Sequence, residues 1–559
     1  MRYSAGMKAT LPEALPASGV IWLVAVLPFA SFWLPFQTGL WVRGVTVATI
    51  VAALIAAGHR DIVRAVREAP RAVRLGLLLY SAATIYGAAV GMALGNPIRY
   101  VVTQTASMLI LPASFVGFCT GTRLNLKGLA TGLGLGGAVA LAVHLGFLVA
   151  HRGEPSVAGE ALRLALPNDV SLTGVAVMAT LMSLAWWYEV RNVVAACAAT
   201  ASACLLVGSM SRGAWLVSAG AIVLAWWLSS RRAWWTLALV AAAPLLCVAA
   251  LVAASSLVSG RGLSLVGPGL EVRPHGPGEQ ATDLKRNVVV TGRPVEIDFA
   301  ASGSTSPRPV LFVEARNTAG VVTSFNFRAP TSCADCAGAR FVQFLPPGTV
   351  RLDFWVWQAG GNGEVLTLGA RELPGALAGW LRTVDLRLRT TATALTHPAE
   401  DGTMQYRLSE LAAVRRVWAT APAVRRISGQ GLGAVIEFPN SSWDNHGHRI
   451  VVPVASYLHN FYVFLGFKLG IAGLAALAGL LLVAGWSLSS AWVVRSHGGS
   501  ALASAAAACW CAYLAWAVTS PEIINANTAT FLGALVAASV ADAATLKSTA
   551  PERHPEASA

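Results

Sequence analysis

Charged side chains are scarce in this chain, and acidic ones are scarcer than basic ones. Only 12% of the 559 residues are Asp, Glu, Lys or Arg, whereas 55% are hydrophobic. A soluble globular domain carries about 25% charged residues, so this shortage excludes that class. Apolar runs long enough to cross a hydrocarbon core of roughly 30 Å recur along the chain. The composition therefore predicts a polytopic α-helical membrane protein.

The shortage of acids leaves a formal net charge of +14, from 41 Lys and Arg against 27 Asp and Glu. An excess of this size is also found in nucleic-acid-binding proteins. Here, however, the arginines are spread over the loops between apolar runs, where they have a topological explanation. We therefore predict no nucleic-acid partner.

The N-terminal residues are followed by an apolar run with no convincing cleavage site, so we interpret this run as a span and not as a removed signal peptide. The apolar runs predict twelve spans: 20–36, 40–57, 75–94, 100–120, 129–150, 170–188, 193–210, 214–228, 233–254, 458–486, 501–519 and 523–541. The expected organisation is nine spans in 1–254, a β-rich insert in 255–372, an Arg-rich helical region in 373–455, three spans in 456–545 and a tail in 546–559.

The short loops between these spans differ in charge. Alternate short loops and both ends hold fifteen Lys and Arg, and the remaining short loops hold four, namely Arg99, Arg152, Arg163 and Arg212. Because positive charge is enriched on the cytoplasmic side, both ends and the first set are predicted to be cytoplasmic. The long polar loop between spans nine and ten then lies on the outer face, together with its re-entry point at His459.

The first part of the long loop is strand-like. Seven short β-rich runs, from NVVV at 287–290 to EVLTL at 364–368, are separated by turn clusters and predict a small β-sandwich. Its aromatic residues fit either a sugar-stacking face or ordinary core packing, and the sequence leaves both interpretations open. These residues are Phe325, Phe327, Phe354, Trp355 and Trp357.

The second part of the loop has apolar residues at three- and four-residue spacing, which predicts two basic helices. Eight arginines stand against only Asp385, Glu400, Asp401 and Glu410. They are Arg382, Arg387, Arg389, Arg407, Arg415, Arg416, Arg425 and Arg426. Substrate binding, a solvated face and contact with anionic headgroups are all compatible with this pattern.

Cysteine is also scarce, with eight residues in the chain. Cys333 and Cys336 are predicted to be outside, and without a second pair nearby they favour a short-loop disulfide over a zinc site. Asp444, His446 and His448 offer a weaker metal-site alternative, against a plain solvent-facing loop. We therefore predict no metal and no cofactor.

Four features are predicted to meet at the outer face: Arg212, the Arg-rich helices, the glycine turn of residues 429–433 and the pair His459-Asn460. Arginine binds phosphate through planar, bidentate donors, and histidine can accept or donate a proton. Asn460 is suited to orient the imidazole or to bind a sugar hydroxyl. Gly466, Gly470 and Gly473 form a small-residue stripe that allows a helix or a lipid chain to approach closely. Together these groups suit an anionic, lipid-linked substrate.

Several short motifs occur in a recognisable order. His459 and Asn460 are followed by nine residues and then by Gly470-Ile471-Ala472-Gly473. Ser211-Arg212-Gly213, Pro167-Asn168-Asp169 and the Gly-x-Gly-x-Gly turn that ends at Gly433 precede them. In these motifs the chain resembles the O-antigen ligase and polymerase superfamily of bacterial inner membranes, and it resembles the ligase branch most. The β-rich insert departs from the compact loop of that family.

This resemblance implies a metal-independent, inverting glycosyltransferase of the GT-C type. Its donor would be a glycan on undecaprenyl diphosphate, and its acceptor lipid A-core or another glycan, at the periplasmic face of the inner membrane. His459 and Arg212 match catalytic positions of the family. For a second essential arginine on the loop the choice is Arg415 or Arg416, with Arg415 preferred as catalytic and Arg407 in reserve. Arg416, Arg407, Asn460 and Asn168 are assigned to substrate binding.

Three other functions remain open. A polymerase would join lipid-linked repeat units, and a protein O-oligosaccharyltransferase would glycosylate a protein. A transporter of lipid-linked glycans is less favoured, because the predicted spans are nearly free of charge and the polar residues gather at one face. The sequence does not identify the sugars, the acceptor, the role of the insert or the oligomeric state.

Overall fold

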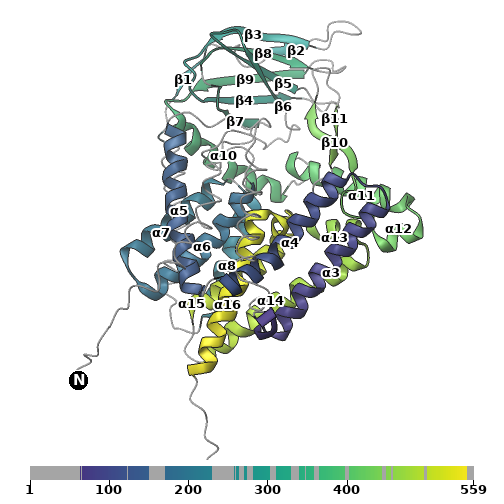
Figure 1. The fold of residues 1–559 in the computed structure, drawn as a ribbon. Helices are drawn as coiled ribbons and strands as arrows, with labels where there is room; N and C mark the ends of the chain where they lie inside the picture. Colours follow the sequence, from purple (N-terminus) through teal and green to yellow (C-terminus); the bar gives the residue numbers. More distant parts are fainter. Residues whose placement is uncertain are drawn as a thin grey trace, which may run out of the picture.

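A computed structural model shows the arrangement of most of the chain (Figure 1). It describes residues 63–64, 66–121, 124–149, 170–209, 211–229, 257, 260–263, 270–272, 281–302, 310–328, 339–346, 348–357, 364–396, 402–443, 449–454, 458–496 and 500–549. The predicted spans 20–36, 40–57 and 233–254 lie outside these ranges, as do Cys333 and Cys336.

The described apolar runs form a bundle of helices. Four of them are long and apolar enough to cross a membrane, which fits a helical membrane protein: Arg71–Ala93, Ile98–Cys119, Ala472–Ser496 and Ala526–Thr545. The helices of the bundle are α3 (Arg71–Ala93), α4 (Ile98–Gly121), α5 (Leu126–Val149), α6 (Val170–Val190), α7 (Val193–Gly208), α8 (Arg212–Leu228), α13 (Phe461–Leu469), α14 (Ala472–Ser496), α15 (Ala501–Trp516) and α16 (Ala526–Thr549). Most begin and end within a few residues of the predicted spans.

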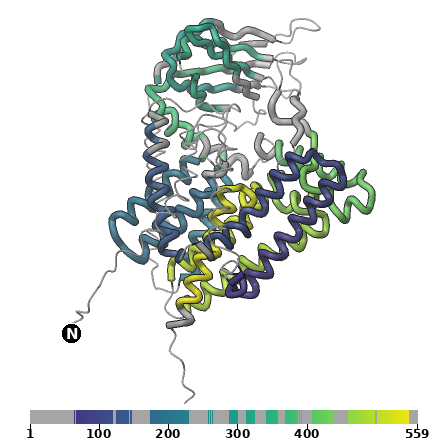
Figure 2. Tube along the Cα trace, in the orientation of Figure 1, coloured from purple at the N-terminus to yellow at the C-terminus, as the bar shows by residue number. Residues whose placement is uncertain are grey.

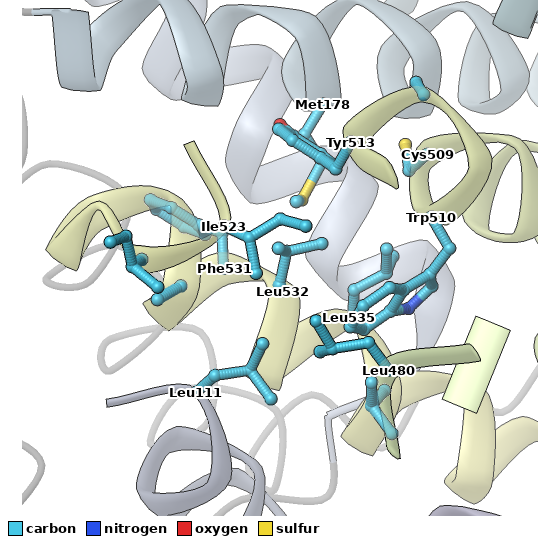
Figure 3. Close-up of a cluster of buried hydrophobic side chains, with 14 of the residues drawn as sticks. Leu111, Met178, Leu480, Cys509, Trp510, Tyr513, Ile523, Phe531, Leu532 and Leu535 are labelled. Carbon is cyan, nitrogen blue, oxygen red and sulfur yellow. The ribbon is translucent and has the colours of Figure 1, made fainter. Parts of the chain in front are cut away.

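Helices from the two ends of the described chain pack directly against each other. Figure 2 shows α3 running beside α14. At their crossing, a Cβ on Gly76 would lie 2.5 Å from the carbonyl oxygen of Gly479, so the absence of both side chains lets the backbones touch. Deeper in the bundle, buried side chains such as Leu111, Trp510 and Leu535 join α4, α15 and α16 in one core (Figure 3).

The predicted span over 458–486 is not one continuous helix, and that prediction is wrong. The short helix α13 ends at Leu469, and α14 begins at Ala472. Gly470 lies between them with a φ of 58°, in the left-handed region that disfavours residues with a Cβ. The amide of Ile471 donates to the carbonyl of Ile427 at 2.8 Å, so a segment of the long loop takes the bond that a continuing helix would have made.

The seven predicted β-rich runs are strands of two antiparallel sheets. These seven strands are β3 (Ala281–Val289), β4 (Val295–Ser302), β5 (Val310–Asn317), β6 (Val322–Arg328), β7 (Ala339–Gln343), β8 (Thr349–Trp357) and β9 (Glu364–Glu372). Two further short strands, β1 (Arg261–Gly262) and β2 (Leu270–Val272), were not predicted. One sheet has the order β1-β9-β4-β7 with β2 beside β9, and the other has the order β3-β8-β5-β6. Alternate residues face a shared core, in which Ile297 and Phe299 of β4 pack with Phe354 of β8.

Helix α10 (Ala376–Thr396) lies between this β-rich region and the helix bundle (Figure 1). Its Trp380 and Val384 belong to a cluster that includes Phe344, which follows β7, and Val207 of α7. On the same side, Glu296 of β4 accepts from Arg371 at 2.7 Å and from Arg382 of α10 at 3.0 Å. Apolar packing and buried ion pairs therefore attach the sheets to the bundle through α10.

Three further elements complete the long loop. Helix α11 (Gly402–Thr420) and the short helix α12 (Ala423–Ser428) lead to the glycine turn, and β10 (Ile436–Trp443) pairs with β11 (Arg449–Val454) before the chain reaches His459. The β10–β11 hairpin was not predicted. Figure 1 places α11 and α12 on the flank of the bundle, next to α13 and α3.

Candidate functional site

His459 is placed by the start of α13. The side-chain oxygen of Asn460 accepts from the amide of Val463 at 2.9 Å, so Asn460 is the N-cap of this helix. The amide of Phe461 donates to the carbonyl of Ala517 at the end of α15, at 2.8 Å. These two bonds fix the imidazole directly before the first turn of α13. The first gives Asn460 a structural task in addition to the substrate contact predicted for it.

Glu410 of α11 binds His459 through both of its oxygens. One accepts from the His459 backbone amide at 2.9 Å, and the other lies 3.2 Å from Nδ1 of the ring. The Glu410 side chain is 4% exposed. Because a carboxylate is an acceptor, this contact favours the tautomer with hydrogen on Nδ1, which leaves Nε2 as an acceptor. Tyr406 touches the ring edge-on, with centroids 5.0 Å apart.

The rotation of α11 separates the three candidate loop arginines. At about 100° per residue, Arg407 lies about 60° from Glu410 around the helix, whereas Arg415 and Arg416 lie about 140° and 120° away. Arg407 is half-buried, and Arg415 and Arg416 are exposed. Arg407, the reserve choice from the sequence, therefore shares the His459 side of α11. Arg415, the preferred choice, lies on the outer side together with Arg416.

Arg212 is the first residue of α8, and the hydroxyl of Ser211 caps this helix by accepting from the amide of Ala214. Gly213 packs so tightly on α15 that a Cβ there would lie 2.8 Å from Nε1 of Trp516. Ala517, the next residue of that turn, binds the start of α13. Arg212 and His459 thus lie on helix starts that contact the same turn at the end of α15. Asn168 lies outside the described residues.

The glycine turn packs against the bundle and leaves little room for a substrate. Gly429, Gly431 and Gly433 all have positive φ. The amides of Gln430 and Gly431 donate to the end of α13, that of Leu432 to Gly87 of α3, and that of Gly433 to Gln104 of α4. Since these amides are used in packing, the turn positions α12 and α13 and does not present a row of donors to an anion.

The glycine stripe of 466, 470 and 473 is also used for packing. A Cβ on Gly466 would lie 3.2 Å from the ring of Trp418 in α11, and one on Gly473 would lie 2.6 Å from the carbonyl of Leu465. The sequence predicted that another helix or a lipid chain approaches these glycines closely. The close neighbours are instead residues of the Arg-rich helical region and of α13 itself. Within the nine-residue spacer, Lys468 is buried and donates to the carbonyl of Ala434.

A second buried carboxylate lies at the same end of the bundle. Glu522, in the short connection between α15 and α16, accepts from the hydroxyl of Ser520 at 2.9 Å. Close to it, the hydroxyl of Tyr513 donates to the carbonyl of Gly174 in α6 at 2.5 Å. The Tyr513 bond ties the end of α15 to the start of α6, and α16 packs on the same point, since a Cβ on Gly174 would collide with Oγ1 of Thr528.

No protein-family model matches this chain, and no curated protein matches it. The resemblance to the ligase superfamily therefore depends on the motifs quoted above.

Sequence reasoning missed Glu410 and Tyr406 as partners of His459. Glu410 was visible as one of four acids among eight arginines, and an isolated acid in a basic helix is a signal of a specific partner. Among the described residues, no group of three His, Cys, Asp or Glu is placed to hold a metal ion. Asp444, His446 and His448 lie outside those residues.

Proposed function

We propose that this chain is a glycosyltransferase that moves a glycan from undecaprenyl diphosphate to an acceptor hydroxyl at the periplasmic face of a bacterial inner membrane. The observation that carries the proposal is the His459–Glu410 pair, in which the contact at Nδ1 favours the tautomer whose Nε2 is the basic nitrogen. Arg212 and Arg407 at the same end of the bundle support it, because a departing diphosphate needs positive charge beside it. The motif order resembling the O-antigen ligases is the second support.

In the proposed reaction, the acceptor hydroxyl attacks the anomeric carbon from the face opposite the diphosphate. The new glycosidic bond forms as the bond to the diphosphate oxygen breaks, which inverts the anomeric carbon. Nε2 of His459 takes the proton of the hydroxyl, and the Glu410 carboxylate stabilises the resulting imidazolium through Nδ1. Arg212 and Arg407 neutralise the diphosphate that leaves. The step is metal-independent, as the resemblance implies.

We propose a membrane topology together with this function. The chain has twelve spans and cytoplasmic ends, and its periplasmic loop carries a β-sandwich. The acceptor is lipid A-core or another glycan. The polymerase alternative uses the same site and the same donor. It differs only in the acceptor that binds beside His459, which is then a second lipid-linked glycan.

The test is transfer by the purified full chain in proteoliposomes. The donor is the undecaprenyl-diphosphate-linked glycan extracted from the bacterium that encodes the chain, with lipid A-core either added or left out. One product that requires lipid A-core supports a ligase. A ladder of products without lipid A-core supports a polymerase, and no transfer from this donor to either acceptor contradicts the proposal.

A further inference from the structure

The outer side of α11 and the whole of α12 form a surface that is both apolar and basic. Four exposed apolar side chains lie on it, with Val424 74% and Ile427 61% exposed. The members of this surface, which we call the α11–α12 outer face, are Leu408, Leu411, Arg415, Arg416, Val424, Arg425, Arg426 and Ile427. The chain has no Asp or Glu from 411 to 436. The arginines of this surface therefore have no acid nearby in the sequence.

Water is an unfavourable environment for the large exposed aliphatic side chains of this surface, whereas its arginines are suited to an anionic partner. The spacing of residues along α11 gives the helix two different sides, one packed against His459 and one exposed. Tyr406 and Glu410 contact His459. Leu408 and Arg415 lie on the opposite side of the helix, and the exposed Leu411 lies at the edge of that side. The outer side is therefore free to contact something other than the site.

The attachment of α12 to the bundle fixes its depth along α3. Leu432, just after α12, binds the carbonyl of Gly87. Gly87 lies six residues before Ala93, the last residue of α3, which corresponds to about 9 Å along the helix. With 23 residues, α3 is about 35 Å long, against a hydrocarbon core of about 30 Å. With α3 centred in the core, the amide of Leu432 lies roughly 6 Å inside the hydrocarbon boundary, so the turn after α12 enters the acyl-chain region.

The α11–α12 outer face continues into the apolar surface of the bundle. Ile427 is bonded to Ile471 at the start of α14, and both side chains are exposed. Leu474 of α14 is exposed as well, as are Ile85 and Met92 of α3. In a helix that spans a membrane, exposed aliphatic side chains of this kind face lipid. The apolar residues of α12 thus extend a lipid-facing surface outward to the interface.

We propose that the α11–α12 outer face is a docking surface for anionic phospholipids of the surrounding membrane. Val424 and Ile427 enter the acyl-chain boundary, and Leu408 and Leu411 lie above them. Arg415, Arg416, Arg425 and Arg426 bind headgroup phosphates, for which the planar guanidinium is a bidentate donor. Four arginines within the stretch 411–436, which contains no Asp or Glu, select an anionic headgroup over a zwitterionic one. Because α11 also carries Glu410, lipid on this surface holds the helix that orients His459.

The first test measures lipid selectivity. The full chain is reconstituted in nanodiscs of equal parts phosphatidylglycerol and phosphatidylcholine, and the lipids that remain bound after release into detergent are counted by native mass spectrometry. The wild type is expected to retain phosphatidylglycerol over phosphatidylcholine by at least about threefold. The double variant Arg425→Gln/Arg426→Gln is expected to lose most of that preference, and so is Arg415→Gln/Arg416→Gln.

The matched control is Arg293→Gln/Arg351→Gln, which removes two exposed arginines of the β-rich region and is expected to keep the wild-type preference. Elution as a single peak in size exclusion shows that each variant is folded. If both α11–α12 double variants retain phosphatidylglycerol as the wild type does, or if the control loses it equally, the proposal is wrong.

The second test measures depth. Nitroxides are attached at Val424→Cys and Ile427→Cys in a chain whose native cysteines are replaced, and the chain is placed in phosphatidylglycerol-containing nanodiscs. Both labels are expected to collide more with oxygen than with a water-soluble nickel complex. A label at Ser324→Cys, on an exposed strand of the β-rich region, is expected to show the reverse. Greater access to nickel at 424 and 427 would show that the surface lies in water and would overturn the proposal.

Discussion

Helices α10 and α11 have similar length and similar arginine content, and they lie next to each other in the sequence, but their charges are used differently. On α10, Arg382 binds Glu296 at 3.0 Å and Asp385 at 3.0 Å, so its charge is neutralised within the scaffold. On α11, the one buried acid binds His459, and Arg415 and Arg416 remain exposed. An arginine-rich amphipathic helix can therefore either attach one region of the protein to another or present its arginines to a ligand. The positions of the neighbouring acidic residues distinguish the two cases.

The largest difference is expected between the inner and the outer arginines of α11. Arg407→Gln should lower glycan transfer about 10²–10³-fold, the usual loss when one group that stabilises the transition-state charge is removed. Arg212→Ala should abolish transfer while leaving expression intact. Arg415→Gln should lose far less than Arg407→Gln. The measurement is the initial rate of glycan transfer in proteoliposomes. If Arg415→Gln lowers this rate more than Arg407→Gln does, Arg415 and not Arg407 is the catalytic arginine.

Glu410 should show the next largest effect. Glu410→Gln keeps the size of the side chain but removes the charge that stabilises imidazolium, so kcat should fall about 10–100-fold with little change in KM for the donor. Combined with His459→Gln, it should add no further loss, because both changes disable the same unit. Independent, multiplicative losses in the two variants would show that Glu410 acts apart from His459.

On α10, the corresponding change should affect stability and not chemistry. Glu296→Gln weakens the bonds to Arg371 and Arg382 and should lower the free energy of unfolding by about 1–3 kcal/mol, with transfer within about threefold of wild type. Thermal unfolding of the purified chain is the measurement. The control is Asp298→Asn, which breaks a more exposed pair with Arg340 and should cost less than about 1 kcal/mol. Equal shifts in the two variants would mean that burial of the Glu296 pairs adds nothing.

The smallest effect is expected at Asn460, where the N-cap contributes about 1 kcal/mol to α13. Asn460→Ala should lower transfer only a few-fold, by loosening the helix start that places His459. Asn460→Ser keeps a capping oxygen and should restore most of the rate. If Asn460→Ser is as slow as Asn460→Ala and raises KM for the donor, Asn460 binds substrate directly, as the sequence interpretation held.

The local elements could be predicted well from the sequence. The apolar run from Val170 is helix α6 from its first residue, and each of the seven β-rich runs is a strand. Such elements depend on periodicity and on turn residues, which are local properties. The side of α11 on which Arg407 lies could also be predicted, because the apolar Ala413 and Val414 lie at helical spacing from Glu410 and mark an inner side that excludes Arg415.

Other features depended on contacts between distant segments and could not be predicted from the sequence. The helix break at Gly470 requires Ile427 to arrive from more than forty residues earlier and take the amide of Ile471. The same holds for the pairing of His459 with Glu410, which are 49 residues apart. A Gly-x-x-Gly stripe is equally compatible with a straight helix that packs closely and with a helix that ends, and only the neighbouring segment decides.

The central claim is that His459, held by Glu410, accepts the proton of the acceptor during transfer. Its most direct test is the initial rate of glycan transfer by His459→Ala in proteoliposomes, with the wild type and Asn460→Ser measured alongside and the folding of each checked by size exclusion. Loss of a general base predicts a fall of about 10²–10⁴-fold. A purified, folded His459→Ala chain that transfers glycan within about threefold of the wild-type rate would contradict the claim.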